Sequence, residues 1–203
     1  IEGSDKMQIL KMLTRLRQLC LEPRLVYDNI DQPSSKLKAC MELIKTMQEN
    51  KQKVLLFSSF TSALDLIAEE CQKAGITYYM LTGSTNKEER RELVSRFQKD
   101  DTTLFLISLK AGGTGLNLTS AENVIHYDPW WNVSAQNQAT DRAYRIGQKS
   151  NVQVFNLVMK DSVEEKIIEM QKRKKELADM FVENNSGGLS QMSKEDILSL
   201  FTM

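Results

Sequence analysis

The chain has 203 residues, of which 41% are hydrophobic, and 27 Lys and Arg balance 27 Asp and Glu. This composition supports one sizeable core and excludes a disordered or fibrous chain. Because the formal net charge is zero, the chain does not resemble a polybasic nucleic-acid binder, and any nucleic-acid contact must be a local site. The three cysteines form no C-x-x-C pair and the single histidine is His126, so the sequence indicates neither a disulfide framework nor a zinc cluster.

The sequence shows neither a membrane-spanning segment nor a signal-peptide pattern. No apolar run approaches the ~20 residues of a membrane span, and the N-terminus lacks the charged-then-apolar pattern of a signal peptide. We therefore expect a soluble, intracellular protein without a membrane partner. Because the chain begins Ile-Glu-Gly-Ser rather than with Met, we also expect it to be a piece of a longer protein.

The hydrophobic pattern alternates between helical and strand periods along the chain. An apolar stripe of Ile9, Leu10, Leu13, Leu16 and Cys20 predicts a first amphipathic helix. Two capping boxes, Thr85-x-x-Glu88 and Ser162-x-x-Glu165, predict the starts of later helices. In all, we expect helices over residues 5–21, 35–49, 61–73, 85–98 and 134–146 and from 162 onward, with strands over 54–57, 76–81, 104–107, 124–127 and 152–158.

Strands that alternate with helices predict an α/β fold with a parallel sheet of five or six strands, covered by helices on both faces. The pattern also predicts helical extensions at both ends. We expect an N-terminal helical segment over residues 1–33, the α/β domain over 34–160, and a C-terminal helical extension over 161–203.

A glycine-rich loop follows the third predicted strand. Gly112, Gly113 and Gly115 would let backbone amides approach an anion closely, as in a phosphate-binding loop. However, the chain contains neither G-x-x-x-x-G-K-[ST] nor G-x-G-x-x-G, so it lacks a nucleotide-cradling loop of its own. A tight turn without function remains an alternative for this segment.

Two arginines are the strongest candidates for anion binding. On the predicted helix over 134–146, Gln138, Arg142 and Arg145 stand at i, i+4 and i+7 and share one face. An arginine pair with no acidic residue at i±4 suits a polyanion. The alternative is a solvated basic face.

Two adjacent tryptophans, Trp130 and Trp131, come directly after the fourth predicted strand. Consecutive side chains point in different directions, so we expect one ring to be buried and the other to be exposed for stacking or for a partner. We assign a structural role to Asp128, because no P-loop accompanies it, and interpret His126 as a core imidazole rather than a catalytic base.

Six ordered segments resemble the second motor lobe of Swi/Snf-family DNA translocases, and the resemblance covers nearly the whole chain. The string Asp-Arg-x-x-Arg-Ile-Gly-Gln is the most specific of them. The segments are Val54–Phe60, Thr82–Ser84, Glu89-Arg90 leading to Phe97, Ala111–Leu118, Asp128–Asn132 and Gln138–Gln148.

The resemblance implies a RecA-like, P-loop NTPase-like sheet and half of an ATP site. In that family two lobes close around ATP, and the first lobe supplies the phosphate loop, the Mg²⁺-binding acidic residues and the catalytic base. In this chain, Arg142 and Arg145 match the arginine fingers that stabilise charge in phosphoryl transfer. Gly112, Gly113 and Gln138 match residues near the ATP.

The resemblance also implies a set of duplex-DNA contacts. Backbone amides and hydroxyls on phosphates would give the sequence-independent grip that a motor needs. Ser59 stands where many relatives carry Gln, and Lys110 stands where many carry Arg, so the bidentate fork of that contact is lost. The matching positions are Ser59, Gly83, Ser108, Lys110 and Trp131.

We therefore expect the C-terminal lobe of a DNA-dependent ATPase that moves along duplex DNA and displaces or remodels DNA-bound proteins. Its other partner would be the N-terminal RecA-like lobe of the same chain, and the isolated lobe would be inactive. An RNA helicase lobe and a catalytically silent docking module remain alternatives. The compact spacing of the motifs favours a bacterial or archaeal cytoplasm or nucleoid over a nucleus.

Overall fold

The computed structural model describes residues 3–112, 116–141, 143 and 151–183. The chain divides into two compact units, Ile1–Ile167 and Ile168–Met203. All the sites considered below lie in the first unit. None of the described helices is both long and apolar enough to cross a membrane.

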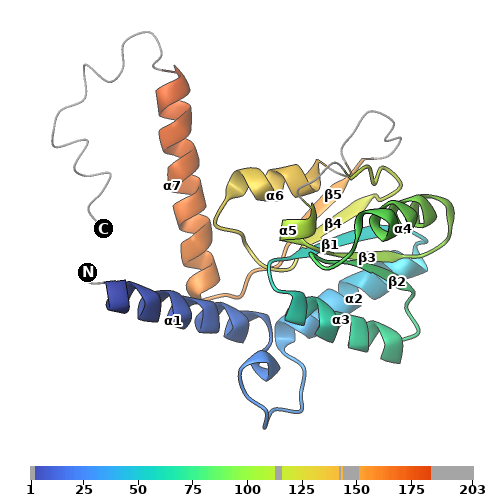
Figure 1. The fold of residues 1–203 in the computed structure, drawn as a ribbon, viewed down its shortest axis with the longest axis horizontal. Helices are drawn as coiled ribbons and strands as arrows, with labels where there is room; N and C mark the ends of the chain where they lie inside the picture. Colours follow the sequence, from blue (N-terminus) through green and yellow to red (C-terminus); the bar gives the residue numbers. More distant parts are fainter. Residues whose placement is uncertain (1–2, 113–115, 142, 144–150, 184–203) are drawn as a thin grey trace. The chain divides into compact units, whose positions relative to one another are not determined.

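A five-stranded parallel sheet forms the centre of the first unit, with the strand order β2-β3-β1-β4-β5 (Figure 1). Its central strand, β1, pairs with β3 on one side and β4 on the other, and β1 and β3 are buried along their whole length. The expected α/β fold is thus confirmed. The strands are β1 (Val54–Ser58), β2 (Tyr78–Leu81), β3 (Leu104–Ser108), β4 (Asn123–His126) and β5 (Gln153–Asn156).

Helices cover both faces of this sheet (Figure 1). Because side chains alternate along a strand, Leu56 faces the core beneath α2 and α3, whereas Leu55 and Phe57 face the core beneath α4 and α6. The α-helices are α1 (Gly3–Leu21), α2 (Ser35–Glu49), α3 (Thr61–Lys73), α4 (Lys87–Lys99), α5 (Leu109–Gly112), α6 (Val133–Thr140) and α7 (Val163–Glu183), and a 3₁₀ turn, η1, covers Pro23–Leu25.

The predicted bounds of α2 and α3 are confirmed, whereas the predicted capping box at Thr85 is wrong. The side chain of Asn86 caps α4 by accepting bonds from the amides of Glu88 and Glu89 at 3.0 and 2.9 Å. Thr85 instead accepts a bond from the amide of Thr82 within the preceding turn. Thr85 and Asn86 are both residue types that cap helices. Because the Thr85 hydroxyl is bonded within the turn, Asn86 is the one that caps α4.

The second predicted capping box, at the start of α7, forms with a shift of one residue. Ser162 accepts a bond from the amide of Glu164 at 3.1 Å, whereas a regular capping box would use the amide of Glu165. Glu165, however, accepts from the amide of Asp161 rather than from that of Ser162.

The predicted helix over 134–146 is too long. In the structure α6 ends at Thr140, and Asp141 and Ala143 lie in a turn. The amide of Ala143 donates to the carbonyl of Thr140 at 3.1 Å, a spacing of three residues rather than four, and the Ala143 side chain is buried. Gln138 lies on α6, whereas Arg142 and Arg145 lie outside the described residues, so the shared face predicted for the three stays a prediction.

The apolar stripe predicted for the first helix is exposed along most of α1. Ile9, Leu10 and Leu16 are exposed by 47%, 53% and 45%, and burial is concentrated near the C-terminal end of the helix, at Arg17 and Leu21. Among the described residues, α1 packs chiefly against η1 and α2, close to its C-terminal end (Figure 1). An amphipathic pattern identifies the apolar face of a helix, but it does not show how much of that face this lobe covers.

Candidate functional site

The carboxyl ends of the parallel strands bring together segments from across the chain, the position where open α/β sheets bind ligands. Among the residues predicted to contact DNA, Ser59 follows β1, Gly83 follows β2, Lys110 follows β3 and Trp131 follows β4, while Ser108 is the last residue of β3. The structure thus places all five at one edge of the sheet. Gly83 and Lys110 are exposed, Ser59 and Trp131 are half-buried, and Ser108 is buried.

Asp128 is the centre of a hydrogen-bond network at this edge. One carboxylate oxygen accepts bonds from the Ser58 hydroxyl at 2.7 Å and the Ser59 amide at 3.0 Å. The other accepts from the Ser59 hydroxyl and from Nη2 of Arg17, the latter at 2.9 Å. Since Asp128 is only 1% exposed and carries four bonds, the structural role predicted for it is confirmed.

Arg17 reaches this network from the last turns of α1. Besides Asp128, its Nη2 donates to the Ser59 hydroxyl at 2.8 Å. Its guanidinium carbon also lies 4.9 Å from the ring centre of Phe60 and 5.9 Å from those of Trp130 and Trp131. Both tryptophans are half-buried, so neither ring is as fully buried or as fully exposed as expected. Trp130 packs against the core beneath α4 and α6, as a burial account of one ring predicts.

Sequence reasoning assigned no function to Arg17, although a signal for it exists. Arg17 is four residues after Leu13 and three before Cys20, which places it on the apolar stripe predicted for this helix. A charged residue on such a face is uncommon unless it has a buried partner. The pattern could not identify that partner, because Asp128 lies 111 residues further along the chain.

His126, the last residue of β4, is a core residue as expected. Its Nε2 lies 2.9 Å from the Thr140 hydroxyl, and its ring stacks on Phe57 with 5.7 Å between ring centres. Burial lowers the pKa of His126 to about 4. Within the described part of the chain Nδ1 has no hydrogen-bond partner, so a proton there would be unpaired.

Comparison with known proteins identifies the family. Residues 35–147, more than half of the chain, match the helicase conserved C-terminal domain. The solved SWI2/SNF2 ATPase core of Sulfolobus solfataricus in complex with dsDNA is 30% identical, with a TM-score of 0.74, over 98% of this chain and 43% of that one. The chain belongs to the Swi/Snf family of helicase C-terminal lobes.

Curated relatives of this helicase lobe include bacterial and eukaryotic proteins. A Mycoplasma pneumoniae protein named as an uncharacterized ATP-dependent helicase is 36% identical over 99% of the chain and 20% of its own length. The mouse SWI/SNF-related matrix-associated actin-dependent regulator of chromatin subfamily A member 1 is 35% identical over 97% of the chain and 20% of its own length. The helicase lobe thus spans about a fifth of the curated relatives it matches.

The helicase lobe offers only part of a nucleotide site within its described residues. Gly112 is the last residue of α5, and Gln138 is exposed on α6, which packs against α5. Gly113, Arg142 and Arg145 lie outside the described residues. In the part of the lobe that the structure describes, no three His, Cys, Asp or Glu side chains gather as a metal site.

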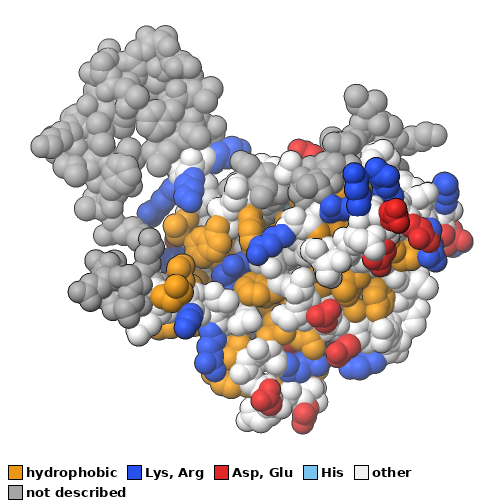
Figure 2. Space-filling view, viewed as in Figure 1, with side chains coloured by type: hydrophobic (Ala, Val, Ile, Leu, Met, Phe, Trp, Pro, Cys, Tyr) orange, Lys and Arg blue, Asp and Glu red, His pale blue; other side chains and the backbone are white. Residues whose placement is uncertain are grey.

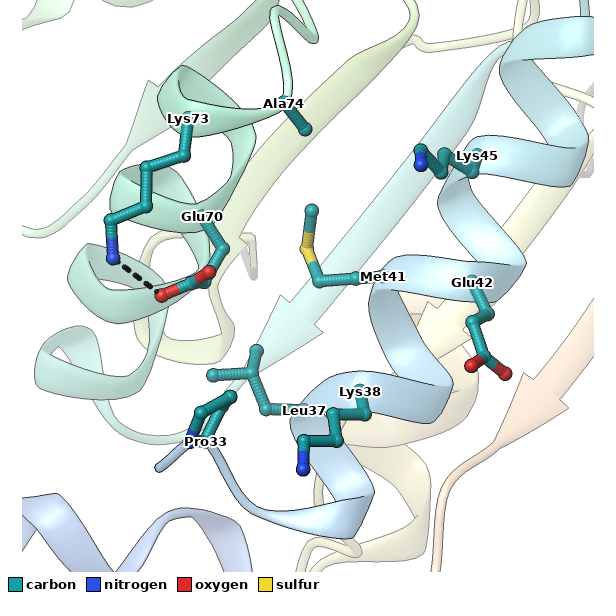
Figure 3. A pocket seen from close by; sticks show the side chains of 9 residues that line it. All are labelled: Pro33, Leu37, Lys38, Met41, Glu42, Lys45, Glu70, Lys73 and Ala74. Atoms are coloured by element: carbon teal, nitrogen blue, oxygen red, sulfur yellow. Dashed lines mark hydrogen bonds and ion pairs between the residues drawn. The ribbon is translucent and has the colours of Figure 1, made fainter. Parts of the chain in front are cut away.

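Two pockets of the helicase lobe lie outside the Asp128 network. A pocket of about 350 Å³ between α2 and α3 has mixed charge, with Lys38, Glu42 and Lys45 on one wall and a Glu70–Lys73 ion pair on the other (Figure 3). A second pocket, of about 650 Å³, is lined by α4 and by Leu116 and Asn117, and its described lining residues include three cations and no acidic side chain. Figure 2 shows Lys and Arg side chains gathered over α4, next to acidic ones.

Proposed function

We propose that the helicase lobe is the second motor lobe of an enzyme that couples ATP hydrolysis to movement along double-stranded DNA. The main support is that residues matched to DNA contacts share one sheet edge, in a fold that has been solved with duplex DNA bound. The lobe would act together with the N-terminal RecA-like lobe of the same protein and displace or remodel DNA-bound proteins. Relatives named as chromatin regulators support this reading.

The edge suits a sequence-independent grip on phosphates. Lys110 supplies an exposed cation and Gly83 an exposed turn, and a Cβ built on Gly83 would meet no atom within 4 Å. The protein itself therefore leaves room for a side chain at Gly83, and a close approach of the DNA backbone would explain a glycine there.

The Ser59 hydroxyl contributes differently from these two residues. It donates its only proton to Asp128 and accepts a bond from Arg17. A DNA phosphate has no proton to donate, so Ser59 could bind one only by releasing Asp128. Ser59 therefore acts mainly through the position of its loop.

The lobe would complete an ATP site that the first lobe begins. Arg142 and Arg145 would neutralise charge on the phosphates in the transition state, and Gly112, Gly113 and Gln138 would border the nucleotide. ATP supplies the hydrolysable phosphoanhydride bond, and Mg²⁺ would be held mainly by the first lobe. Because this chain lacks a P-loop, the lobe alone would hydrolyse no ATP.

The decisive test is steady-state ATP hydrolysis by the full-length protein without nucleic acid, with duplex DNA and with RNA. We expect strong stimulation by duplex DNA, and a loss of roughly 10³-fold or more in Arg142→Ala and Arg145→Ala while ATP binding persists. Arg96→Ala, at an exposed arginine of α4, is the matched control and should retain the wild-type rate. Stimulation by RNA alone would instead indicate an RNA helicase, and no hydrolysis under any condition would indicate a docking module.

A finer test isolates the DNA contacts. Since Gly83 has open space around it and no positive φ, Gly83→Ala should leave the melting temperature unchanged. The added methyl group should nevertheless raise the duplex concentration that gives half-maximal stimulation. Equal half-saturation for Gly83→Ala and wild type would remove Gly83 from the proposed interface.

A further inference from the structure

We propose that Arg17 is a positioning residue for the DNA interface: it fixes the loops that follow β1 and β4, and thereby Ser59 and Trp131, from a helix that precedes the whole α/β domain. The inference rests on the proposed function and assigns α1 a role in it. Arg17 itself is only 8% exposed, so it acts on DNA through these loops rather than by contact.

Side-chain hydrogen bonds join the loops at the ends of β1 and β4. Ser59 and Trp131 are 72 positions apart, and the strands that precede them are neighbours in the sheet. Beyond the strand ends, the Ser59 loop is tied to the β4 loop through Asp128. Arg17 is the only cation among the described residues that bonds to this carboxylate, so it neutralises the charge on which the junction depends.

The aromatic rings provide a second, independent link. Phe60 belongs to the β1 loop, whereas Trp130 and Trp131 belong to the β4 loop, and the guanidinium lies within 6 Å of all three ring centres. A planar cation among rings from two loops restrains their relative positions. The guanidinium thus joins the two loops both by hydrogen bonds and by ring contacts.

Arg17 also joins this junction to α1. The helix begins far from the sheet and leaves a row of apolar side chains exposed toward its N-terminal end. A displacement of α1 would move Arg17 together with both loops. Arg17 is therefore placed to transmit the position of α1 to the DNA-facing edge.

The test uses the full-length protein and varies the concentration of duplex DNA in the ATPase assay. Arg17→Met keeps the length and apolar packing of the side chain but removes its charge and hydrogen bonds. We expect it to raise the half-saturating DNA concentration about tenfold while changing the maximal rate much less. Arg17→Lys keeps the charge without the planar group and should recover part of this loss. The matched control is Arg15→Met, which removes an exposed arginine of the same helix that lies over the Tyr27 ring, away from the Asp128 network.

Hydrogen exchange in the same protein measures positioning without relying on activity. In Arg17→Met, amide exchange should rise in peptides over 58–60 and 130–132 and stay unchanged over β3. Ile44→Ala truncates a fully buried side chain of α2 that does not belong to the Asp128 network, so it should lower the melting temperature without changing the half-saturating DNA concentration. This variant separates lost stability from lost positioning.

The outcomes distinguish the inference from the proposed function. A wild-type protein that duplex DNA does not stimulate would refute the proposed function, and the inference with it. Stimulation that Arg17→Met and Arg15→Met alter equally would refute the inference alone. Faster loop exchange with unchanged half-saturation would also overturn it, because Arg17 would then be a purely structural residue.

Discussion

Two buried ion pairs join distant parts of the helicase lobe, and they differ in what surrounds them. Lys36 bonds both carboxylate oxygens of Glu164, at 2.6 and 2.7 Å, with side chains only 3% and 1% exposed. Arg17 shares the carboxylate of Asp128 with two serines and lies beside half-buried aromatic rings at the sheet edge. The first pair is enclosed by the protein, whereas the second borders the surface proposed to meet DNA.

The comparison shows that a buried ion pair can fix the packing of two helices or the position of two surface loops. An enclosed pair contributes little net stability, because removing both charges from water offsets their attraction. What the Lys36–Glu164 pair does determine is where the first turn of α7 lies against α2. The Arg17–Asp128 pair determines instead where two loops lie, and it is the one that can influence binding.

The largest effect that we predict comes from breaking the enclosed pair. Lys36→Met leaves the Glu164 carboxylate buried without its cation and should lower the free energy of unfolding by about 3–5 kcal/mol. The double variant Lys36→Met/Glu164→Gln should recover most of this loss, since no charge is left unpaired. Urea denaturation measures both.

The exposed ion pair between Lys73 and Glu70 is the control for this prediction. Lys73 is 64% exposed, so Lys73→Met should change the free energy of unfolding by less than about 1 kcal/mol. If Lys36→Met costs no more than Lys73→Met, burial does not distinguish the two pairs as we argue.

Asp128→Asn should have the next largest effect on the free energy of unfolding, because every group that bonds the Asp128 carboxylate is a donor. An amide offers one accepting oxygen, and its NH₂ group would face donors from Arg17, Ser58 or Ser59. We expect a loss of about 2–3 kcal/mol in the free energy of unfolding, against about 1 kcal/mol for Ser58→Ala. Equal losses from the two variants would show that the carboxylate charge adds nothing to the network.

His126 provides the contrasting case of a buried ionisable group without an ionic partner. Its pKa of about 4 in the folded chain lies below the ordinary value of 6.5, so the unfolded chain binds the proton first. The free energy of unfolding should therefore stay level above about pH 7 and fall by about 2 kcal/mol between about pH 7 and pH 5.

The test of this pH dependence is simple because His126 is the only histidine of the chain. Urea denaturation of the wild type and of His126→Gln at several pH values isolates its contribution. The variant should lose the slope between about pH 7 and pH 5, even if it is less stable throughout. A slope that persists in His126→Gln would assign the proton uptake to other groups.

Much of the fold could be predicted from local pattern, because strands and helices have different apolar periods. The helices α2 and α3 and the parallel sheet followed from that pattern alone. The end of α6 could not be predicted, because apolar residues continue at helical spacing through Ala143 and Ile146. The Thr140 hydroxyl bonds to His126 in the sheet, a tertiary contact that local periodicity does not contain.

The candidate site was predictable to a similar degree. The loops after the strands could be assigned to one edge because parallel strands end together. The bonds between those loops could not, since they depend on which strands are neighbours and on Arg17, which precedes the sheet. Sequence thus indicated which residues share the edge, and the structure added what holds two of its loops together.

The smallest effect that we predict concerns the cap of α4, close to the Gly83 turn. Asn86→Ala removes the acceptor of two helix amides and should cost about 1 kcal/mol, whereas Thr85→Ala removes one bond within a turn and should cost less. The reverse order would restore the capping box predicted at Thr85.

If the turn holds Gly83 toward DNA, as the proposed interface requires, Thr85→Ala should still weaken the DNA stimulation of the ATPase more than Asn86→Ala does. Thr85→Ala would then be the more stable variant and yet the one less stimulated by DNA. The free energy of unfolding depends on the helix cap, whereas the contact with DNA depends on the turn.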